Sequence, residues 1–105
     1  MKNIEIYQIK SDIDENIYRK ISFMRFDMVN DVIDLHKFRD YYKKVYEFTQ
    51  DFESTSDQII LDEIFAKFNM DRPDDFKGHS LSISDIVIID DKAYFCDSWG
   101  WINIE

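Results

Sequence analysis

The side chains that could do chemistry lie mainly in the stretch from Asp75 to Trp101. This stretch contains the only cysteine, Cys96, together with His79, Asp85 and Asp97. A cysteine attacks as a thiolate, so it needs a base such as His79, and a carboxylate can orient the imidazole. However, no spacing forces these groups together, and Cys96 stands in a strand-like run, where a lone cysteine is typically a small buried hydrophobe. We therefore expect no catalytic residue, and a small Cys/His enzyme is the least favoured hypothesis.

Metal and cofactor signatures are missing from the sequence. The two histidines, His36 and His79, are 43 positions apart, and there is no HxH, HExxH or CxxC spacing. The acidic run from Asp71 to Asp75 does not fit a calcium loop, because Pro73 interrupts it and no glutamate occupies the final position. Two glycines cannot form a glycine-rich phosphate loop. We expect no metal and no cofactor.

The serine-rich segment that begins at Gly78 has a structural interpretation. Gly78 permits a turn that other residues resist. The serines after it can hydrogen-bond to nearby backbone groups as the chain enters a strand. With two later polar residues, the segment predicts a structural polar motif made of Gly78, Ser80, Ser82, Ser84, Asp85, Asp97 and Ser98.

Asp85 is the most unusual member of this motif, because it stands between Ile83 and Ile86. A carboxylate in an apolar strand either faces solvent or is buried with a partner. We expect it to accept hydrogen bonds from the Gly78–Ser84 turn or from Arg72. A structural network is favoured over a functional site at this position.

Apolar periodicity predicts the elements that position these residues. Strand-forming runs cover Asn3–Ile9, Ile17–Phe26, Tyr42–Gln50, Ser84–Asp91, Lys92–Trp99 and Trp101–Ile104. A short helix over Asp14–Ile21 competes with the second of these strands. The stretch that begins at Asp27 predicts a loop with one helical turn, up to the third strand. Asp90-Asp91 predicts a two-residue hairpin turn between the fourth and fifth strands.

One helix is predicted over Ser54–Asn69, with Thr55 or Ser56 as its N-cap. Its apolar residues fall on one stripe at helical spacing: Ile60, Leu61, Ile64, Phe65 and Phe68. We expect this whole stripe, Phe65 included, to pack against the sheet. The sequence thus predicts an α+β fold, a small antiparallel sheet covered by one main α-helix and ending in a C-terminal β-hairpin.

The composition is typical of a small globular domain. With 105 residues, 45% of them hydrophobic and 16% aromatic, a single domain over residues 1–105 with its own core is expected. The lone cysteine allows no intrachain disulfide, which favours a reducing cytoplasmic location for a domain this small. The N-terminus lacks a signal-peptide pattern, and the apolar runs of about four residues are far too short to cross a membrane.

The charge is strongly uneven along the chain. Residues 1–50 contain nine acidic and nine basic residues, whereas residues 51–105 contain 13 acidic and four basic residues and so carry the entire net charge of −9. This balance argues against direct binding of nucleic acid or of an anionic membrane, since both need a basic surface. It favours a protein partner with a basic surface, or good solubility alone.

The acidic half supplies the candidate partner-binding residues Asp57, Asp62, Glu63, Asp71, Asp74, Asp75, Asp90 and Asp91. Electrostatic complementarity of this kind mainly sets the association rate and the choice of partner. If the charge serves solubility only, the contact surface must lie on the neutral half. The exposed aromatic residues expected there are Tyr41, Tyr42 and Tyr46.

The stretch Phe68–Ile104 resembles the YodL-like domain of Bacillota. The matching positions are Phe68-Asn69, Pro73, Asp75-Phe76, Gly78, Ser80-Leu81-Ser82, Ser84-Asp85, Tyr94, Asp97-Ser98 and Trp99-Gly100. Val45–Phe48 resembles a weaker upstream segment of the same family. The Trp-Gly-Trp order departs slightly from the Gly-aromatic order of the family pattern.

The resemblance implies a small cytoplasmic effector, of phage, mobile-element or cell-shape-antagonist type, that binds a host protein without catalysis. We therefore expect a non-catalytic inhibitor or modulator of a bacterial protein, as a monomer or weak dimer. The alternative is a counter-defence protein of anti-restriction or anti-CRISPR type, whose acidic face imitates nucleic acid.

Overall fold

A computed structural model describes all residues of the chain, 1–105. Its centre is a five-stranded antiparallel sheet in the order β2-β1-β3-β4-β5. The strands are β1 (Lys2–Ile9), β2 (Tyr42–Gln50), β3 (Ile86–Ile89), β4 (Lys92–Asp97) and β5 (Gly100–Asn103). The predicted α+β fold with an antiparallel sheet and a C-terminal hairpin is confirmed.

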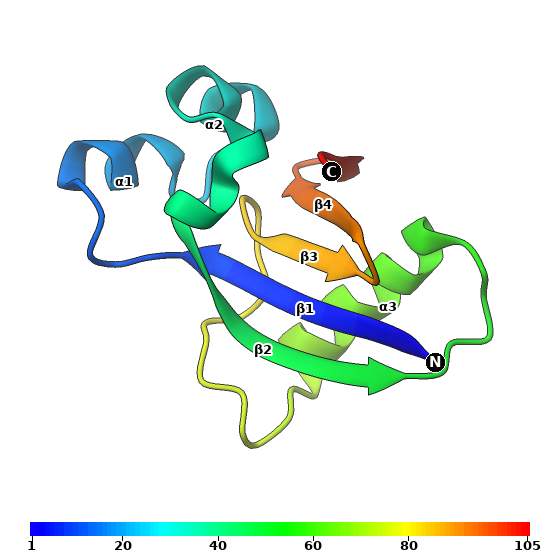
Figure 1. The fold of residues 1–105 in the computed structure, drawn as a ribbon. Helices are drawn as coiled ribbons and strands as arrows, with labels where there is room; N and C mark the ends of the chain where they lie inside the picture. The colour runs from blue at the N-terminus through cyan, green and yellow to red at the C-terminus, as the bar shows by residue number, and fades with distance from the viewer.

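Helices cover both faces of this sheet (Figure 1). On one face lies α3 (Asp57–Met70), and on the other lie α1 (Glu15–Ile21), α2 (Phe26–Val32) and the 3-10 helix η1 (Leu35–Asp40). The central strand β3 therefore buries both of its sides, and all four of its residues are buried. One main helix was expected, so the second helical layer is an addition to the predicted architecture.

The predicted strand over Ile17–Phe26 is wrong, and the competing short helix is correct. The Asp14 side chain accepts hydrogen bonds from the N–H groups of Asn16 and Ile17, at 2.9 and 3.2 Å, and so caps α1. Ile17 and Ile21 are four residues apart and both pack towards the sheet. This spacing satisfies a helix as well as a strand, so the cap decides between them.

The stretch between Phe26 and β2 contains more helix than predicted. It forms α2 and η1, both of them short, instead of a loop with a single turn. The buried side chains of this stretch pack with β3 and β4 in one core cluster, and these are Val29, Ile33, Leu35 and Phe38. Short helices of this kind depend on tertiary packing. The longest helix, α3, has 14 residues, and the structure contains no helix that could span a membrane.

Most of the predicted stripe on α3 is buried, but Phe65 is not. Its neighbours in the stripe are at most 1% exposed, whereas Phe65 is 37% exposed. A helix turns by about 100° per residue, which places Phe65 at one edge of the stripe. Its ring meets the edge of Trp101, with ring centroids 6.3 Å apart. The expectation that Phe65 belongs to the buried core is therefore wrong.

The predicted turn at Asp90-Asp91 joins β3 to β4. Asp90 adopts a φ of 53°, in the left-handed region that few residues other than glycine occupy. Its side chain accepts a hydrogen bond from the N–H of Asn3 at 2.9 Å, which ties the turn to β1. Asp90 thus has a structural contact as well as an exposed charge.

Candidate functional site

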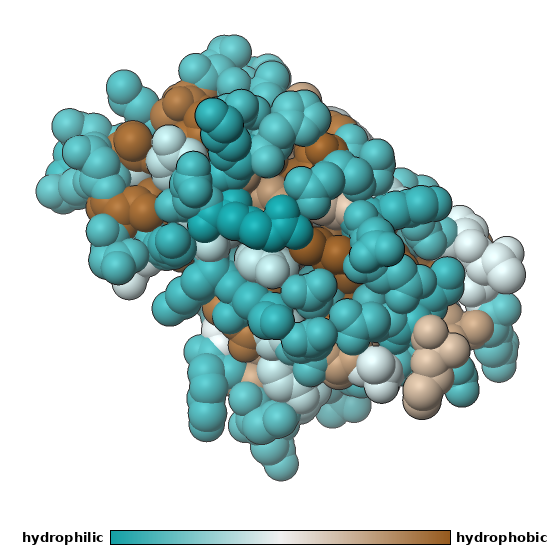
Figure 2. Space-filling model, in the orientation of Figure 1, coloured by the Kyte–Doolittle hydropathy of each residue, from teal (hydrophilic) through white to brown (hydrophobic).

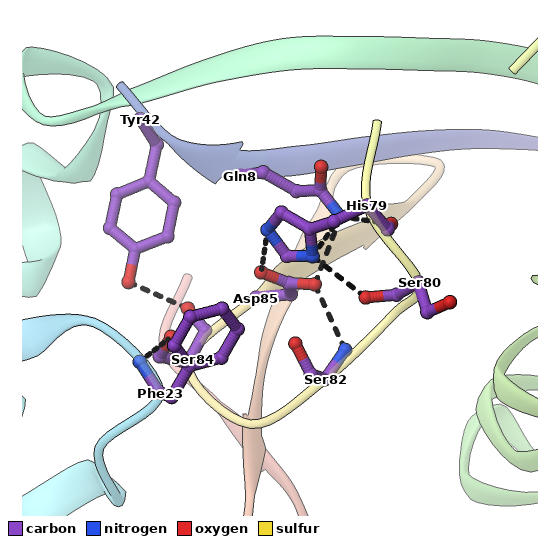
Figure 3. A network of polar contacts seen from close by, with 8 residues as sticks. All are labelled: Gln8, Phe23, Tyr42, His79, Ser80, Ser82, Ser84 and Asp85. Atoms are coloured by element: carbon purple, nitrogen blue, oxygen red, sulfur yellow. Dashed lines mark hydrogen bonds and ion pairs between the residues drawn. The ribbon is translucent and has the colours of Figure 1, made fainter. Parts of the chain in front are cut away.

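A buried polar network joins the segment before β3 to the end of β1 (Figure 3). Asp85 is 1% exposed, and its Oδ2 atom accepts hydrogen bonds from the Ser82 N–H at 3.0 Å and from Gln8 Nε2 at 3.1 Å. The Ser82 contact matches the expected donor in the Gly78–Ser84 turn. The other donor is Gln8 and not Arg72, which is exposed.

Gln8 was missed by sequence reasoning, although β1 contained a signal. Successive side chains of a strand point to opposite faces, so Gln8 lies on the same face of β1 as Ile4 and Ile6, and its amide must point into the core. Gln8 is only 2% exposed, and Nε2 also donates to the carbonyl of His79 at 2.9 Å. A polar residue at an inward position predicts a buried partner elsewhere in the fold.

Burial dominates the electrostatics of Asp85. Loss of water raises its pKa to about 8, although the hydrogen bonds from Ser82 and Gln8 act in the opposite direction. The Nε2 atom of His79 lies 3.8 Å from Asp85 Oδ1. The Nδ1 atom lies 2.7 Å from the Ser80 carbonyl and 3.3 Å from Gln8 Nε2.

Gly78 owes its place to a close approach of side chains. A Cβ atom at this position would lie 2.4 Å from Gln8 Oε1 and 2.9 Å from Phe76 Cζ. Any larger residue would push against the amide that holds Asp85. The other predicted motif residues differ in role: Ser80 and Ser98 are exposed, and the buried Ser82 Oγ has no hydrogen-bond partner.

Ser84 is the second centre of the network. It is buried at a φ of 81°, and its Oγ accepts a hydrogen bond from the N–H of Phe23 at 3.1 Å. Its carbonyl oxygen accepts one from the Tyr42 hydroxyl at 2.6 Å. Tyr42 is only 1% exposed, so the expectation that it is an exposed aromatic residue is wrong. Phe23 itself has a φ of 60°. Two non-glycine residues in the left-handed region thus meet through one hydrogen bond.

Asp97 fixes the chain at the start of α2, three residues after Phe23. Arg25 is the N-cap residue of α2, but it makes no side-chain capping bond. Asp97, at the end of β4, accepts a hydrogen bond from the N–H of Phe26 at 2.8 Å and supplies the missing cap. Two motif side chains, on Ser84 and Asp97, therefore hold the segment Phe23–Phe26 at both ends.

The segment Phe23–Phe26 and the first turn of α2 expose apolar side chains to solvent. Phe23 is 56% exposed, Met24 36% and Met28 44%. With the half-buried Ile83 and with Arg25, whose charge pairs with Asp27 at 2.7 Å, these residues line a shallow hollow of about 430 Å³, which we call the apolar patch. On the face drawn in Figure 2, most of the surface is hydrophilic and hydrophobic side chains are visible in several separate areas.

A second hollow adjoins the apolar patch through Ile83. Phe65 and Trp101 supply its apolar wall, and Asp62 and Asp97 supply carboxylates. The apolar patch therefore has an acidic neighbour on one side.

The candidate catalytic groups do not share a hollow. Cys96 and Asp97 line the hollow beside Phe65, whereas His79 lines another, beside Gln8. Burial, and next the charge of Asp85, raise the pKa of the Cys96 thiol to about 12. No group of three or more His, Cys, Asp or Glu side chains is placed to hold a metal ion.

Cys96 is therefore expected to react with a thiol reagent very slowly in the folded protein. A pKa of about 12 leaves a thiolate fraction at pH 8 roughly 1,000-fold below that of a free cysteine. The rate of maleimide labelling, measured in buffer and in denaturant, checks this expectation. Fast labelling of the folded protein would show that the thiol is accessible and activated.

The acidic candidate residues fall into three groups. Asp57, Asp90 and Asp91 line a hollow that also contains Lys2 and Lys92. Asp62 and Glu63 are exposed on α3, and Asp71, Asp74 and Asp75 follow its end. A helix of 14 residues is about 20 Å long, which separates the first group from the last. Asp57 and Asp75 also accept hydrogen bonds from the hydroxyls of Tyr94 and Tyr46.

The family model of the YodL-like domain matches residues 3–105. The chain belongs to the YodL-like domain family. The match extends well beyond Phe68–Ile104, where the sequence motifs lie, and includes β1 and the helices of the second layer. No curated protein and no solved structure matches the chain. In this YodL-like domain, motif residues Ser84 and Asp97 shape the exposed segment Phe23–Phe26.

Proposed function

We propose that this YodL-like domain is a non-catalytic protein-binding module that contacts its target through the apolar patch. The observation that carries the proposal is the pair of hydrogen bonds from the N–H groups of Phe23 and Phe26 to Ser84 and Asp97. These bonds hold an aromatic residue at positive φ with its ring largely exposed.

The energetic cost of this arrangement favours a binding role. A bulky residue at positive φ is a genuine outlier and costs on the order of 1–3 kcal/mol. Because the Phe23 side chain is 56% exposed, its burial offsets only part of this cost. Such conformations persist where the surrounding structure holds them, and they concentrate at functional sites.

The chemistry of the apolar patch fits a protein target. Aromatic and methionine side chains are enriched in the centres of protein interfaces. Methionine adapts its shape to a partner because its side chain is flexible and polarisable. Phe23, Met24 and Met28 together provide one rigid ring and two adaptable side chains.

The acidic surroundings suggest which target would bind. Asp62 and Asp97 line the hollow next to the apolar patch, and the net charge of the chain is −9. A bacterial protein with an apolar contact flanked by basic residues complements this surface. Binding of that kind would inhibit or modulate the target. It is favoured over imitation of nucleic acid, because the carboxylates lie in separate groups and Lys2 and Lys92 are interspersed in one of them.

Replacing one exposed methionine tests the proposal. Met28→Lys puts a charge into the apolar patch, and Met70→Lys makes the same change at the end of α3, where Met70 is 86% exposed. Proteins captured from a bacterial lysate by each tagged variant are identified by mass spectrometry, and their affinities are then measured. We expect Met28→Lys to weaken target binding at least tenfold, about 1.4 kcal/mol, and Met70→Lys to leave it unchanged. Equal affinity of wild type and Met28→Lys would overturn the proposal.

A further inference from the structure

A hollow of about 420 Å³ lies where the end of β1, the start of β2 and the loop before β3 meet. Lys43 and Lys44 come from β2, and Lys77 and His79 come from the loop. Gln8 and Tyr18 also contribute to its wall. Its volume is within the range of small-molecule sites, which is about 300–1,000 Å³.

The charge of this hollow is opposite to that of the chain. No carboxylate is among the residues that line it, although the chain has 22 acidic residues and 13 basic ones. Lys44 is partly neutralised by Glu47 and Glu5, with N–O distances of 2.7 and 3.6 Å. Lys43 and Lys77 form no ion pair. Two lysines without an ion pair, from segments far apart in the sequence, therefore line one hollow.

Protection of the sheet edge does not explain the whole arrangement. β2 is an edge strand, and lysines on edge strands discourage pairing with other chains. That role accounts for Lys43 and Lys44. It does not account for Lys77, which comes from a separate loop and lines the same hollow.

We infer that this hollow binds the phosphate group of a small ligand. Lysine ammonium groups recognise phosphate as point charges, whereas planar carboxylates are matched better by the fork of an arginine, and no arginine lines the hollow. The space beside Tyr18 accommodates the rest of the ligand. This site is separate from the apolar patch and does not depend on the proposed protein-binding function.

His79 connects the two surfaces. Its ring lines the basic hollow and also packs against Phe23, with ring centroids 5.5 Å apart. A phosphate in this hollow lies beside His79, whose Nε2 atom is 3.8 Å from Asp85 Oδ1. The bound ligand thus acts on a ring that supports the exposed Phe23.

In the test, each phosphate probe is titrated into the full chain, and binding is monitored through the NMR chemical shifts of the backbone amides. The probes are inorganic phosphate and ADP, at constant ionic strength balanced with chloride. We expect saturable shifts at Lys43, Lys77 and His79. Tighter binding of ADP, with added shifts at Tyr18, identifies a nucleotide-like ligand, and equal binding of both probes identifies the phosphate group alone as the ligand. Either result supports the inference.

Two double variants control for charge. Lys43→Gln with Lys77→Gln removes both free ammonium groups of the hollow, and Lys20→Gln with Lys37→Gln removes two exposed charges elsewhere. We expect the first pair to weaken phosphate binding about tenfold and the second to leave it unchanged. Absence of saturable shifts with both probes would overturn the inference, and so would equal weakening in the two double variants.

Discussion

Asp85→Asn is expected to gain stability relative to the wild type as pH rises from about 4 to about 8. Burial raises the pKa of Asp85 from 3.8 to about 8, so the folded protein binds a proton that the unfolded chain has lost in this range. The contribution of Asp85 is therefore fully present below pH 4 and is lost as pH rises through the folded-state pKa. Asparagine keeps the shape and an oxygen for Ser82 and Gln8, but it carries no charge at any pH.

The size of this difference is several kcal/mol, because each pKa unit corresponds to about 1.4 kcal/mol. The measurement is the free energy of unfolding in urea at pH values from 4 to 8.5 for both proteins. Asp91→Asn is the control, because Asp91 is exposed in the turn between β3 and β4, and its pH dependence should match that of the wild type. Parallel curves for Asp85→Asn and the wild type would show that the carboxylate is well solvated and that the network is wrongly described.

Phe68→Ala is expected to lower the free energy of unfolding by about 3–5 kcal/mol, the range for a fully buried phenylalanine. Phe68 is 0% exposed, and its ring packs against those of Tyr46, Phe48 and Phe76. Phe65→Ala is the matched comparison on the same helix. Because Phe65 is 37% exposed, the same truncation should cost less than half as much. Equal losses in chemical denaturation would mean that both rings belong to the core.

The elements whose apolar residues recur at a clear strand or helix spacing could be predicted from the sequence. β1, β2 and the β3–β4 hairpin alternate or contain strand-forming residues, and α3 has a long apolar stripe at helical spacing. The second helical layer could not be predicted in the same way. In α1, Ile17 and Ile21 fit both periods, and only the Asp14 cap separates the alternatives. In α2, the buried Val29 packs in a cluster with residues of β3 and β4, which lie far away in the sequence.

The site was predictable only in its local part. The turn that donates to Asp85 lies three residues away, at Ser82, and the motif indicated it. Gln8 is 77 residues from Asp85, and no local pattern joins them. The apolar patch could not be predicted either, because it also depends on a contact between residues far apart in the sequence. Phe23 is a residue type that favours buried strands, and the sequence predicted a strand there. In the structure its N–H donates to Ser84 Oγ, its φ is positive, and its ring is exposed.

The most direct test of the central claim is photo-crosslinking from the apolar patch inside bacterial cells. Benzoylphenylalanine replaces Phe23 in one variant and Met70 in another, since both side chains are exposed but lie on different elements. The account predicts that Phe23→benzoylphenylalanine crosslinks to one host protein, that Met70→benzoylphenylalanine does not, and that Met28→Lys abolishes the crosslink. A crosslink from position 70 and none from position 23 would contradict the account.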